Sequence, residues 1–257
     1  MAAQFFLLID NSNSFTKLAL ASREKLLRFA KIATPRLTAK ALATAIRGWR
    51  FDAAVLSSVV PEKGKLLGEF LKKYAPAQNA SRAPKILRVS ARAKLGVGVD
   101  FPNPKTIGAD RLANAAGVVA FYGAPSIVVD FGTAVTFDII SSEKKYIGGV
   151  IAPGLEVMTD YFYQRTALLP KITPAEPKSA IGKSTREAML AGAVFGYRGL
   201  VKQILTEIQH ELNTVKKPKI IATGGYAELI AAKLPAIDRV HANLTLEGLR
   251  VIATLNF

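Results

Sequence analysis

The chain has 257 residues, with 35 Lys and Arg against 19 Asp and Glu, and therefore a net charge of +16. Half of its residues are apolar, a composition that excludes a disordered chain. The absence of Cys excludes disulfide scaffolds, thiolate metal centres and cysteine nucleophiles, and the two His residues have no metal-binding spacing.

The first half of the chain predicts alternating strands and helices. A β-hairpin is expected over Leu7–Leu20, because two short apolar strands flank a turn of small polar residues. The elements expected after it are a strand at Leu26–Ile32, a helix at Thr38–Gly48 capped by Thr38, a strand at Asp52–Ser57, a helix at Pro61–Tyr74, a strand at Ile86–Val89, a turn-rich stretch at Val97–Thr106 and a helix at Ala109–Tyr122.

The second half opens with a similar hairpin. Ile127–Ile140 resembles Leu7–Leu20, since each is an apolar strand that ends in Asp, followed by a turn and a second strand. The matching positions are Asp10 with Asp130, Ser12 with Gly132, and Thr16 with Thr136. The elements expected next are a strand at Lys145–Ile151, helices at Glu156–Leu168 and Ser184–Asn213 (the second interrupted near Gly196–Gly199), a loop at Pro170–Lys183, a strand at Lys219–Ala222 and a helix at Thr245–Leu255. The pattern predicts an α/β protein of two related halves.

The sequence predicts no signal peptide and no membrane span. The apolar run Phe5–Ile9 is short and ends at Asp10. The longest uncharged stretch, Leu112–Val129, contains Asn, Gly and Pro, and its pattern is that of a helix, a turn and a strand. We therefore expect a cytoplasmic protein without membrane contact.

Much of the positive charge lies in the segment Glu62–Lys94, which has nine basic residues against two acidic ones. Its aromatic residues are Phe70 and Tyr74, at helical spacing, so base-stacking platforms are not evident. Charge alone supports only non-specific nucleic-acid binding, and we favour a solvated basic surface that attracts anionic substrates.

The two hairpin turns have the residue types of a nucleotide-phosphate site. Small residues let the backbone approach an anion, and turn amides donate hydrogen bonds to it. A carboxylate repels phosphate but holds the cation that neutralises it, so Asp10 suggests Mg²⁺ coordination, directly or through water. The residues suggested for phosphate contacts are Ser12, Asn13, Ser14 and Thr133, with Lys17 as an added positive charge.

Two further segments each admit two interpretations. Thr223-Gly224-Gly225 follows an apolar run, and its glycines would admit a flat ring such as adenine, or form an ordinary strand-to-helix turn. Asp110 and Arg111 open a predicted helix, where acidic residues are common for capping reasons. Alternatively, Asp110 accepts a proton from a substrate hydroxyl, and Arg111 holds a substrate carboxylate.

Taken in order, these segments resemble the type III pantothenate kinases of the acetate/sugar kinase–Hsp70–actin superfamily. The resemblance covers nearly the whole chain. It rests on Asp10–Lys17, Gly108–Arg111, Asp130–Ala134, Gly148–Gly154, Ala167–Pro170, Ile181–Thr185, Thr223–Gly225 and Leu244–Leu249. It implies two ribonuclease-H-like (actin-like ATPase) domains, each a mixed sheet flanked by helices, expected at residues 1–117 and 118–257.

The resemblance also implies a reaction. ATP would phosphorylate the primary hydroxyl of pantothenate to 4'-phosphopantothenate, the first step of coenzyme A biosynthesis, in a homodimer that uses Mg²⁺ and a monovalent cation, K⁺ or NH₄⁺. Asp110 would be the proton acceptor, and Asp130 would hold the monovalent cation. The implied ATP-binding residues are Asp10, Asn11, Ser12, Asn13, Ser14, Phe15, Thr16, Lys17, Thr133, Gly224 and Gly225. The implied pantothenate-site residues are Phe101, Gly108, Ala109, Asp110, Arg111 and Thr185, the last acting across the dimer interface.

Two positions depart from the family pattern. Ser12 stands where the family usually has Gly, and if that position needed a positive φ, Ser would cost about 1 kcal/mol or more. Phe101 stands where the family commonly has Tyr, so one substrate hydrogen bond would be missing. These departures, with the charge, leave two alternatives: a degenerate kinase-fold protein with a regulatory or nucleic-acid-binding role, and another kinase of the superfamily.

Overall fold

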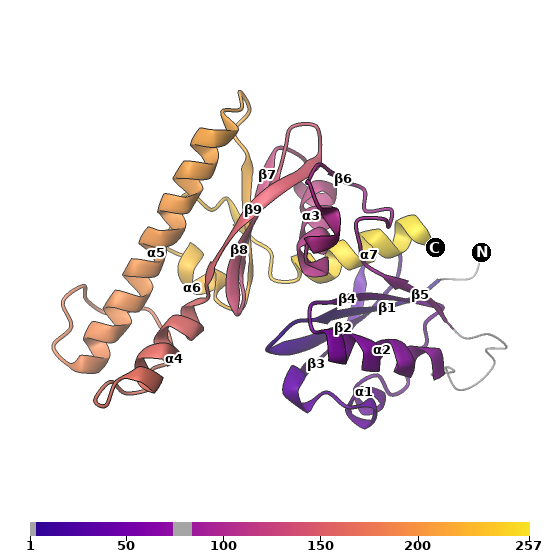
Figure 1. Cartoon of the computed structure of the whole chain (residues 1–257), viewed down its shortest axis with the longest axis horizontal. Helices are drawn as coiled ribbons and strands as arrows, with labels where there is room; N and C mark the ends of the chain where they lie inside the picture. Colours follow the sequence, from indigo (N-terminus) through magenta and orange to yellow (C-terminus); the bar gives the residue numbers. More distant parts are fainter. Residues whose placement is uncertain (1–3, 74–83) are drawn as a thin grey trace. The chain divides into compact units, whose positions relative to one another are not determined.

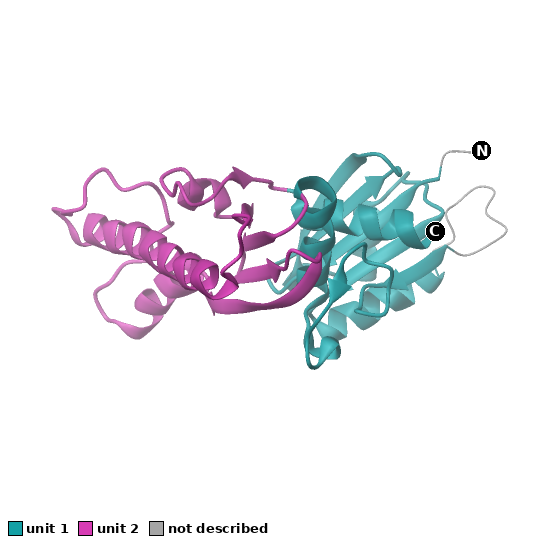
Figure 2. Ribbon diagram, turned by 90° about the horizontal axis from the view of Figure 1, so that it is seen from above, with its two compact units in different colours: residues 1–122, 243–257 teal, residues 123–242 magenta. Residues whose placement is uncertain are grey.

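The computed structural model describes residues 4–73 and 84–257 (Figure 1). The chain divides into two compact units, shown in two colours in Figure 2. Unit 1 comprises Met1–Tyr122 and Asn243–Phe257, and unit 2 comprises Gly123–Ala242. Strands and helices alternate in both units, which confirms the α/β class.

Unit 1 is built on a mixed sheet with the strand order β3-β2-β1-β4-β5. Its strands are β1 (Phe6–Asn11), β2 (Phe15–Ala21), β3 (Leu26–Ala33), β4 (Ala53–Ser58) and β5 (Lys85–Arg88). β1 is antiparallel to β2 and parallel to β4. Because β1 and β4 are covered on both faces, they read as nearly continuous apolar runs.

Helices cover both faces of this sheet (Figure 1). α1 (Ala39–Ala45) and α2 (Pro61–Lys73) lie on one side, over a core that includes Leu18, Leu42 and Trp49. α3 (Ala109–Tyr122) and α7 (Leu244–Asn256) lie on the other. α3 and α7 approach each other very closely. A Cβ on Gly248 of α7 would lie only 1.8 Å from the carbonyl oxygen of Ala113 in α3.

Unit 2 repeats this plan. Its strands are β7 (Ser126–Phe131), β8 (Ala134–Ile140), β9 (Lys145–Pro153), β10 (Lys219–Gly224) and β11 (Arg239–Val240), and its helices are α4 (Leu155–Arg165), α5 (Thr185–Leu212) and α6 (Ala227–Ala231). The order β11-β10-β7-β8-β9 is the counterpart of β5-β4-β1-β2-β3 in unit 1. In each unit the first strand pairs antiparallel with the second and parallel with the fourth. The predicted relation between the two halves is therefore confirmed, and Asp10 and Asp130 lie on equivalent strands.

The elements differ from the prediction in several places. The expected boundary at 117/118 falls inside α3, and the C-terminal helix belongs to unit 1. α5 continues through Gly196–Gly199, where an interruption was expected, and α1 is shorter than the predicted helix. The short elements β6 (Gly98–Val99), η1 (Thr34–Arg36), η2 (Pro104–Thr106), α6 and β11 were not predicted. Tyr74 and Arg82 lie outside the described residues.

Pro170–Lys183 contains no helix or strand, as predicted. Within residues 4–73 and 84–257, no helix combines the length and the apolar character needed to cross a membrane.

Candidate active site

The β1–β2 hairpin of unit 1 turns through Ser12, Asn13 and Ser14. The backbone N–H of Ser12 donates to the carbonyl oxygen of Phe15 at 3.0 Å, which closes the turn. Asp10 is only 3% exposed and is the cross-strand partner of Lys17. The Ser12 hydroxyl lies 3.5 Å from Asp10 Oδ1, to which it donates. Asn13 and Ser14 are exposed, so the tip of the turn is open to a ligand.

Ser12 causes no backbone strain in this turn. Among the described residues other than glycine, those with positive φ are Lys144 and Asn213. Ser12 therefore does not need the left-handed conformation that glycine adopts easily, and the penalty considered from the sequence does not arise.

Three of the predicted ATP-binding residues have side chains that serve the unit itself. Asn11 and Thr16 are fully buried, and Asn11 Nδ2 donates to Thr16 Oγ1 at 2.8 Å. Phe15 is 41% exposed, and Lys31 Nζ lies 3.6 Å from the centre of its ring. Any contact of Asn11 and Thr16 with a ligand would therefore use their backbone rather than their side chains.

In unit 2, the pairing of β7 with β10 brings the predicted residues Asp130 and Gly224 together. Thr223 and Gly224 of β10 are the register partners of Asp130 and Phe131 in β7. Gly224 has a φ of +94°, and a Cβ there would lie 2.6 Å from Asp130 Oδ1. The Asp130 carboxylate thus rests against the bare backbone of Gly224. Thr133 is exposed at the tip of the hairpin.

Gly154 supports the same turn and was not among the predicted site residues. Its N–H donates to the carbonyl oxygen of Thr133 at 3.1 Å. A Cβ at Gly154 would lie 2.2 Å from that oxygen and 2.6 Å from the carbonyl oxygen of Gly132. Only glycine fits here. The sequence signal for this role is the family motif Gly148–Gly154, which by itself does not assign Gly154 to the site.

Gly108, Ala109, Asp110 and Arg111 lie at the start of α3, whereas Phe101 lies in the loop before η2. Asp110 is in the first helical turn, and its Oδ1 accepts the backbone N–H of Arg111 at 2.8 Å. A Cβ on Gly108 would lie 2.5 Å from Asp110 Oδ1, so Gly108 leaves room for the carboxylate. Asp110, Arg111 and Phe101 are all partly exposed. The carboxylate is therefore both oriented by the helix and accessible.

Thr185 and Gly225 are exposed in unit 2. Thr185 is the first residue of α5, next to the N-cap Ser184, whose side chain accepts the N–H of Glu187 at 3.3 Å. Gly225 precedes Tyr226, the N-cap residue of α6. Burial, with Glu156 and Asp160 nearby, raises the pKa of Tyr226.

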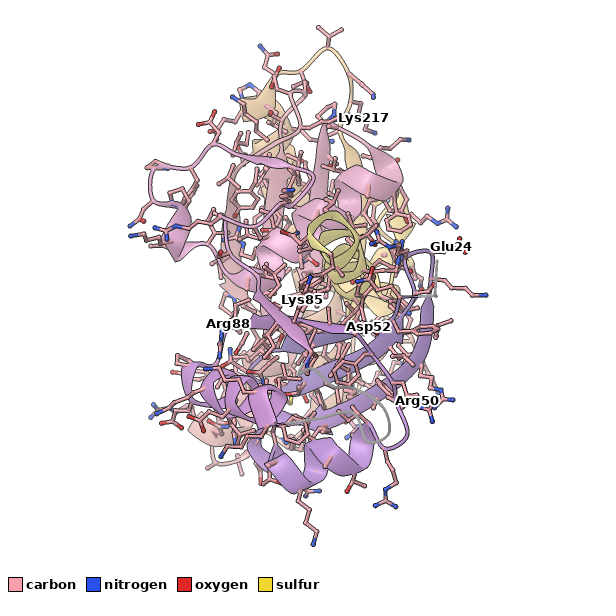
Figure 3. The ribbon with its side chains drawn as sticks, turned by 90° about the vertical axis from the view of Figure 1, so that its right-hand side faces the viewer. Glu24, Arg50, Asp52, Lys85, Arg88 and Lys217 are labelled. Atoms are coloured by element: carbon pink, nitrogen blue, oxygen red, sulfur yellow. The ribbon has the colours of Figure 1, made fainter. Side chains whose placement is uncertain are left out.

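The positive charge is divided unequally between the units. Unit 1 contains 21 Lys and Arg against 8 Asp and Glu, a net +13, whereas unit 2 contains 14 against 11, a net +3. Arg50, Lys85 and Arg88 are among the basic side chains of unit 1 (Figure 3). Most of the field that would attract an anion therefore originates in unit 1.

No group of three or more His, Cys, Asp or Glu side chains that could bind a metal occurs in the described part of the chain. A single buried carboxylate ligand, as Asp10 would provide, suits a divalent ion that keeps several waters and takes its other ligands from a nucleotide. The donor set therefore fits a metal that arrives with ATP.

Solved structures with a similar fold define the class of protein. A Campylobacter jejuni protein assigned to the Baf family of transcriptional activators is similar with a TM-score of 0.60 and 19% identity, over 96% of each chain. MreB 5 of Spiroplasma citri, solved with AMPPNP, is similar with a TM-score of 0.52 and 11% identity, over 96% of this chain and 95% of that one. The two units thus have the fold of the actin-like ATPases and sugar kinases.

Within that class the family is clear. Residues 6–207 match the family model of the type III pantothenate kinases. The type III pantothenate kinase of Akkermansia muciniphila is 50% identical over 253 residues, which cover 98% of this chain and 99% of that protein. The chain belongs to the type III pantothenate kinase family.

Proposed function

We propose that this protein transfers the γ-phosphoryl group of ATP to the primary hydroxyl of pantothenate, the first step of coenzyme A biosynthesis. The observation that carries the proposal is membership of the type III pantothenate kinase family over nearly the whole chain. The reaction needs positioning and charge neutralisation more than covalent chemistry by the protein. Both substrates are anionic, which suits a protein with a charge of +16.

Asp110 is the proposed proton acceptor. As the substrate oxygen attacks the γ-phosphorus, its proton passes to the Asp110 carboxylate. The bond from the Arg111 N–H fixes one oxygen of that carboxylate, and a carboxylate has capacity for further hydrogen bonds. Arg111 is proposed to hold the pantothenate carboxylate, and Gly108, Ala109 and Phe101 to line the same site.

The two hairpin turns are the proposed ATP-binding elements. In unit 1, the exposed tip of the β1–β2 turn would donate backbone N–H groups to phosphate oxygens. Asp10 would hold the Mg²⁺ that accompanies ATP, directly or through water, and this ion would neutralise the transferring group. In unit 2, Thr133 would contact the phosphates, and Gly224 and Gly225 the base.

Asp130 is the proposed ligand of a monovalent cation, K⁺ or NH₄⁺. Its carboxylate lies against Gly224, where the absent Cβ leaves the oxygen within reach of an ion. If this assignment is correct, exchanging K⁺ for Na⁺ raises the KM for ATP or abolishes turnover. Equal activity in the two ions would contradict it.

We also propose a homodimer formed through unit 2. Large apolar side chains are exposed on β9, α4, the following loop and α5, which is unusual for a monomer's surface. They include Ile151, Tyr161, Phe162, Leu168 and Phe195, of which Leu168 is 90% exposed. Thr185, at the start of α5, would then contribute to the pantothenate site across the interface. Light scattering of the wild type and of Phe162→Glu tests this, and a monomeric wild type contradicts it.

The decisive experiment measures ADP release with Mg-ATP, K⁺ and pantothenate. The expected result is pantothenate-dependent turnover that falls at least about 100-fold in Asp110→Asn, as for a lost general base. Glu69→Gln, a comparable change on the exposed face of α2, should keep wild-type activity. Normal turnover in Asp110→Asn would remove the assignment of Asp110.

A second candidate rests on the charge of unit 1. If the wild type has no turnover in either K⁺ or NH₄⁺, the protein is a degenerate kinase, and the net +13 of unit 1 favours nucleic-acid binding. Such binding should weaken steeply with salt. The absence of binding at low salt would rule out this alternative.

A further inference from the structure

We propose that Thr34, the first residue after β3, is a positioning residue that sets the phosphate-binding turn of unit 1. The inference rests on the proposed role of that turn in binding ATP. Thr34 is 22 residues from Ser12 in sequence, is 3% exposed, and has no place in the binding motif. It touches the turn at two points.

Both points of contact are backbone carbonyl groups of the turn. The Thr34 hydroxyl donates to the carbonyl oxygen of Ser12 at 2.7 Å. The Thr34 backbone N–H donates to the carbonyl oxygen of Ser14 at 3.0 Å. One residue thus holds the first and last carbonyls of the three-residue turn.

This clamp fixes the direction of the amides. A trans peptide unit is planar, and its C=O and N–H point in opposite directions. Since the Ser12 carbonyl is turned toward Thr34, the N–H of Asn13 points away from it, on the exposed side of the turn. The Ser14 carbonyl is likewise turned toward Thr34, so the N–H of Phe15 points away from Thr34. These are the groups that a phosphate oxygen would meet.

A relay of side-chain hydrogen bonds runs from β4 to the Thr34 hydroxyl. Ser58 Oγ donates to Asn11 Oδ1 at 2.7 Å, and Asn11 Nδ2 donates to Thr16 Oγ1 at 2.8 Å. Thr16 Oγ1 lies 3.1 Å from Thr34 Oγ1. Because the Thr34 hydrogen goes to Ser12, the bond between the two threonines is donated by Thr16. All the donors therefore run in one direction, from β4 to the turn, and such chains strengthen each bond in them.

The relay makes the turn rigid before ATP arrives. Preorganised donors spare the cost of ordering a loop on binding. Thr34→Val keeps the shape of the side chain but leaves the Ser12 carbonyl and the Thr16 hydroxyl without their partner. One lost buried hydrogen bond corresponds to roughly a 10-fold effect. The expected result is a rise of about that size in the KM for ATP, with kcat and the KM for pantothenate within about 2-fold of wild type.

Three further variants complete the test. Thr34→Ser retains the hydroxyl and should restore the wild-type KM for ATP. Thr34→Cys, with a weak thiol donor, should be intermediate and serves if Thr34→Val does not fold. Thr44→Val, an exposed position on α1, is the matched control and should change nothing.

Hydrogen exchange of residues 11–16 without nucleotide gives a readout independent of activity. Thr34→Val should speed exchange in this peptide alone, and Thr34→Ser should not. Unchanged exchange and KM in Thr34→Val, or in Thr34→Cys relative to Thr34→Ser, would overturn the inference. If the wild type neither binds nor hydrolyses ATP, the proposed function fails, whereas the exchange result still decides whether Thr34 clamps the turn.

Discussion

The structure predicts a large loss of folding stability when Gly224 is substituted. It combines a φ of +94° with a Cβ position that Asp130 and Phe131 leave no room to fill. We consider Gly224→Ala, which adds one methyl group. That carbon would lie 2.6 Å from Asp130 Oδ1 and 2.6 Å from the backbone N and C of Phe131. Two of these atoms belong to the backbone of a central strand and cannot move aside easily.

The cost has two parts. The positive φ costs an alanine about 1–2 kcal/mol relative to glycine. Forcing a methyl group into a filled space costs about 1–3 kcal/mol more. The expected loss of stability for Gly224→Ala is therefore about 2–5 kcal/mol.

Substitutions at two other glycines measure the backbone cost and the steric cost separately. Gly48 has a φ of +74° but nothing within 4 Å of its Cβ position, so Gly48→Ala measures the first part alone. Gly225 has neither feature, and Gly225→Ala should be nearly neutral.

Urea unfolding provides the assay. The single tryptophan, Trp49, is buried in the core of unit 1, so its fluorescence reports on that unit, whereas far-ultraviolet circular dichroism reports on both. Gly224→Ala should lower the dichroism midpoint, and by more than Gly48→Ala lowers the fluorescence midpoint. If Asp130 holds the monovalent cation as proposed, the response of turnover to K⁺ should weaken as well, because Asp130 must move. If Gly224→Ala costs no more than Gly48→Ala, the close contact with Asp130 is not real.

Three further predictions concern electrostatics and the C-terminal helix. Arg198 and Lys233 lower the pKa of Glu176 to about 2. Glu176→Gln should therefore lower the free energy of unfolding by about 1 kcal/mol at pH 7, and the difference from wild type should decline as the pH falls from about 4.5 towards 2. A stability difference that does not change with pH contradicts this. The net charge of +13 on unit 1 should attract the nucleotide. Raising the ionic strength with tetramethylammonium chloride at constant K⁺ should therefore lower kcat/KM for ATP several-fold. A kcat/KM that does not depend on salt would contradict a role of this charge in attracting ATP. Asn256→Ala removes the hydrogen bonds between the Asn256 side chain and the backbone of Lys94. It should destabilise unit 1 by about 1–2 kcal/mol, measured by urea unfolding followed by Trp49 fluorescence. An unchanged unfolding midpoint would show that these hydrogen bonds do not contribute to stability.

The hairpins show what local patterning can predict. Short apolar runs that end in Asp, followed by small polar residues, predicted both hairpins and their equivalence, because turn formation depends on neighbours in sequence. The helix at Ala109–Tyr122 was predicted with the observed bounds for the same reason. The interruption of α5 expected near Gly196–Gly199 was wrong. Gly196 and Gly199 have nothing within 4 Å of their Cβ positions, and the helix continues because Val194, Tyr197 and Val201 bury the opposite face.

Features that depend on distant contacts could not be predicted. The sequence gives no sign that Thr34 holds the turn at Ser12, since the contact depends on how β3 ends beside β2. It likewise could not show that Asn11 and Thr16 turn their side chains inward, or that Gly154 must lack a Cβ because it meets the β7–β8 turn. Motif recognition selected the segments of the candidate site. The orientation of individual side chains within them came from tertiary packing.

The return of α7 to unit 1 has a consequence for how the protein is made. A ribosome produces residues 1–122 first, but the helix that packs on β1, α3 and β4 is translated only after all of unit 2. Until then Phe6 lacks Phe257, with which its ring stacks in the finished protein at a centroid distance of 6.2 Å. Unit 2, being one continuous segment, has no such delay. During synthesis the half that begins first is therefore completed last, and the sheet face that α7 covers in the finished protein stays without this helix in the meantime.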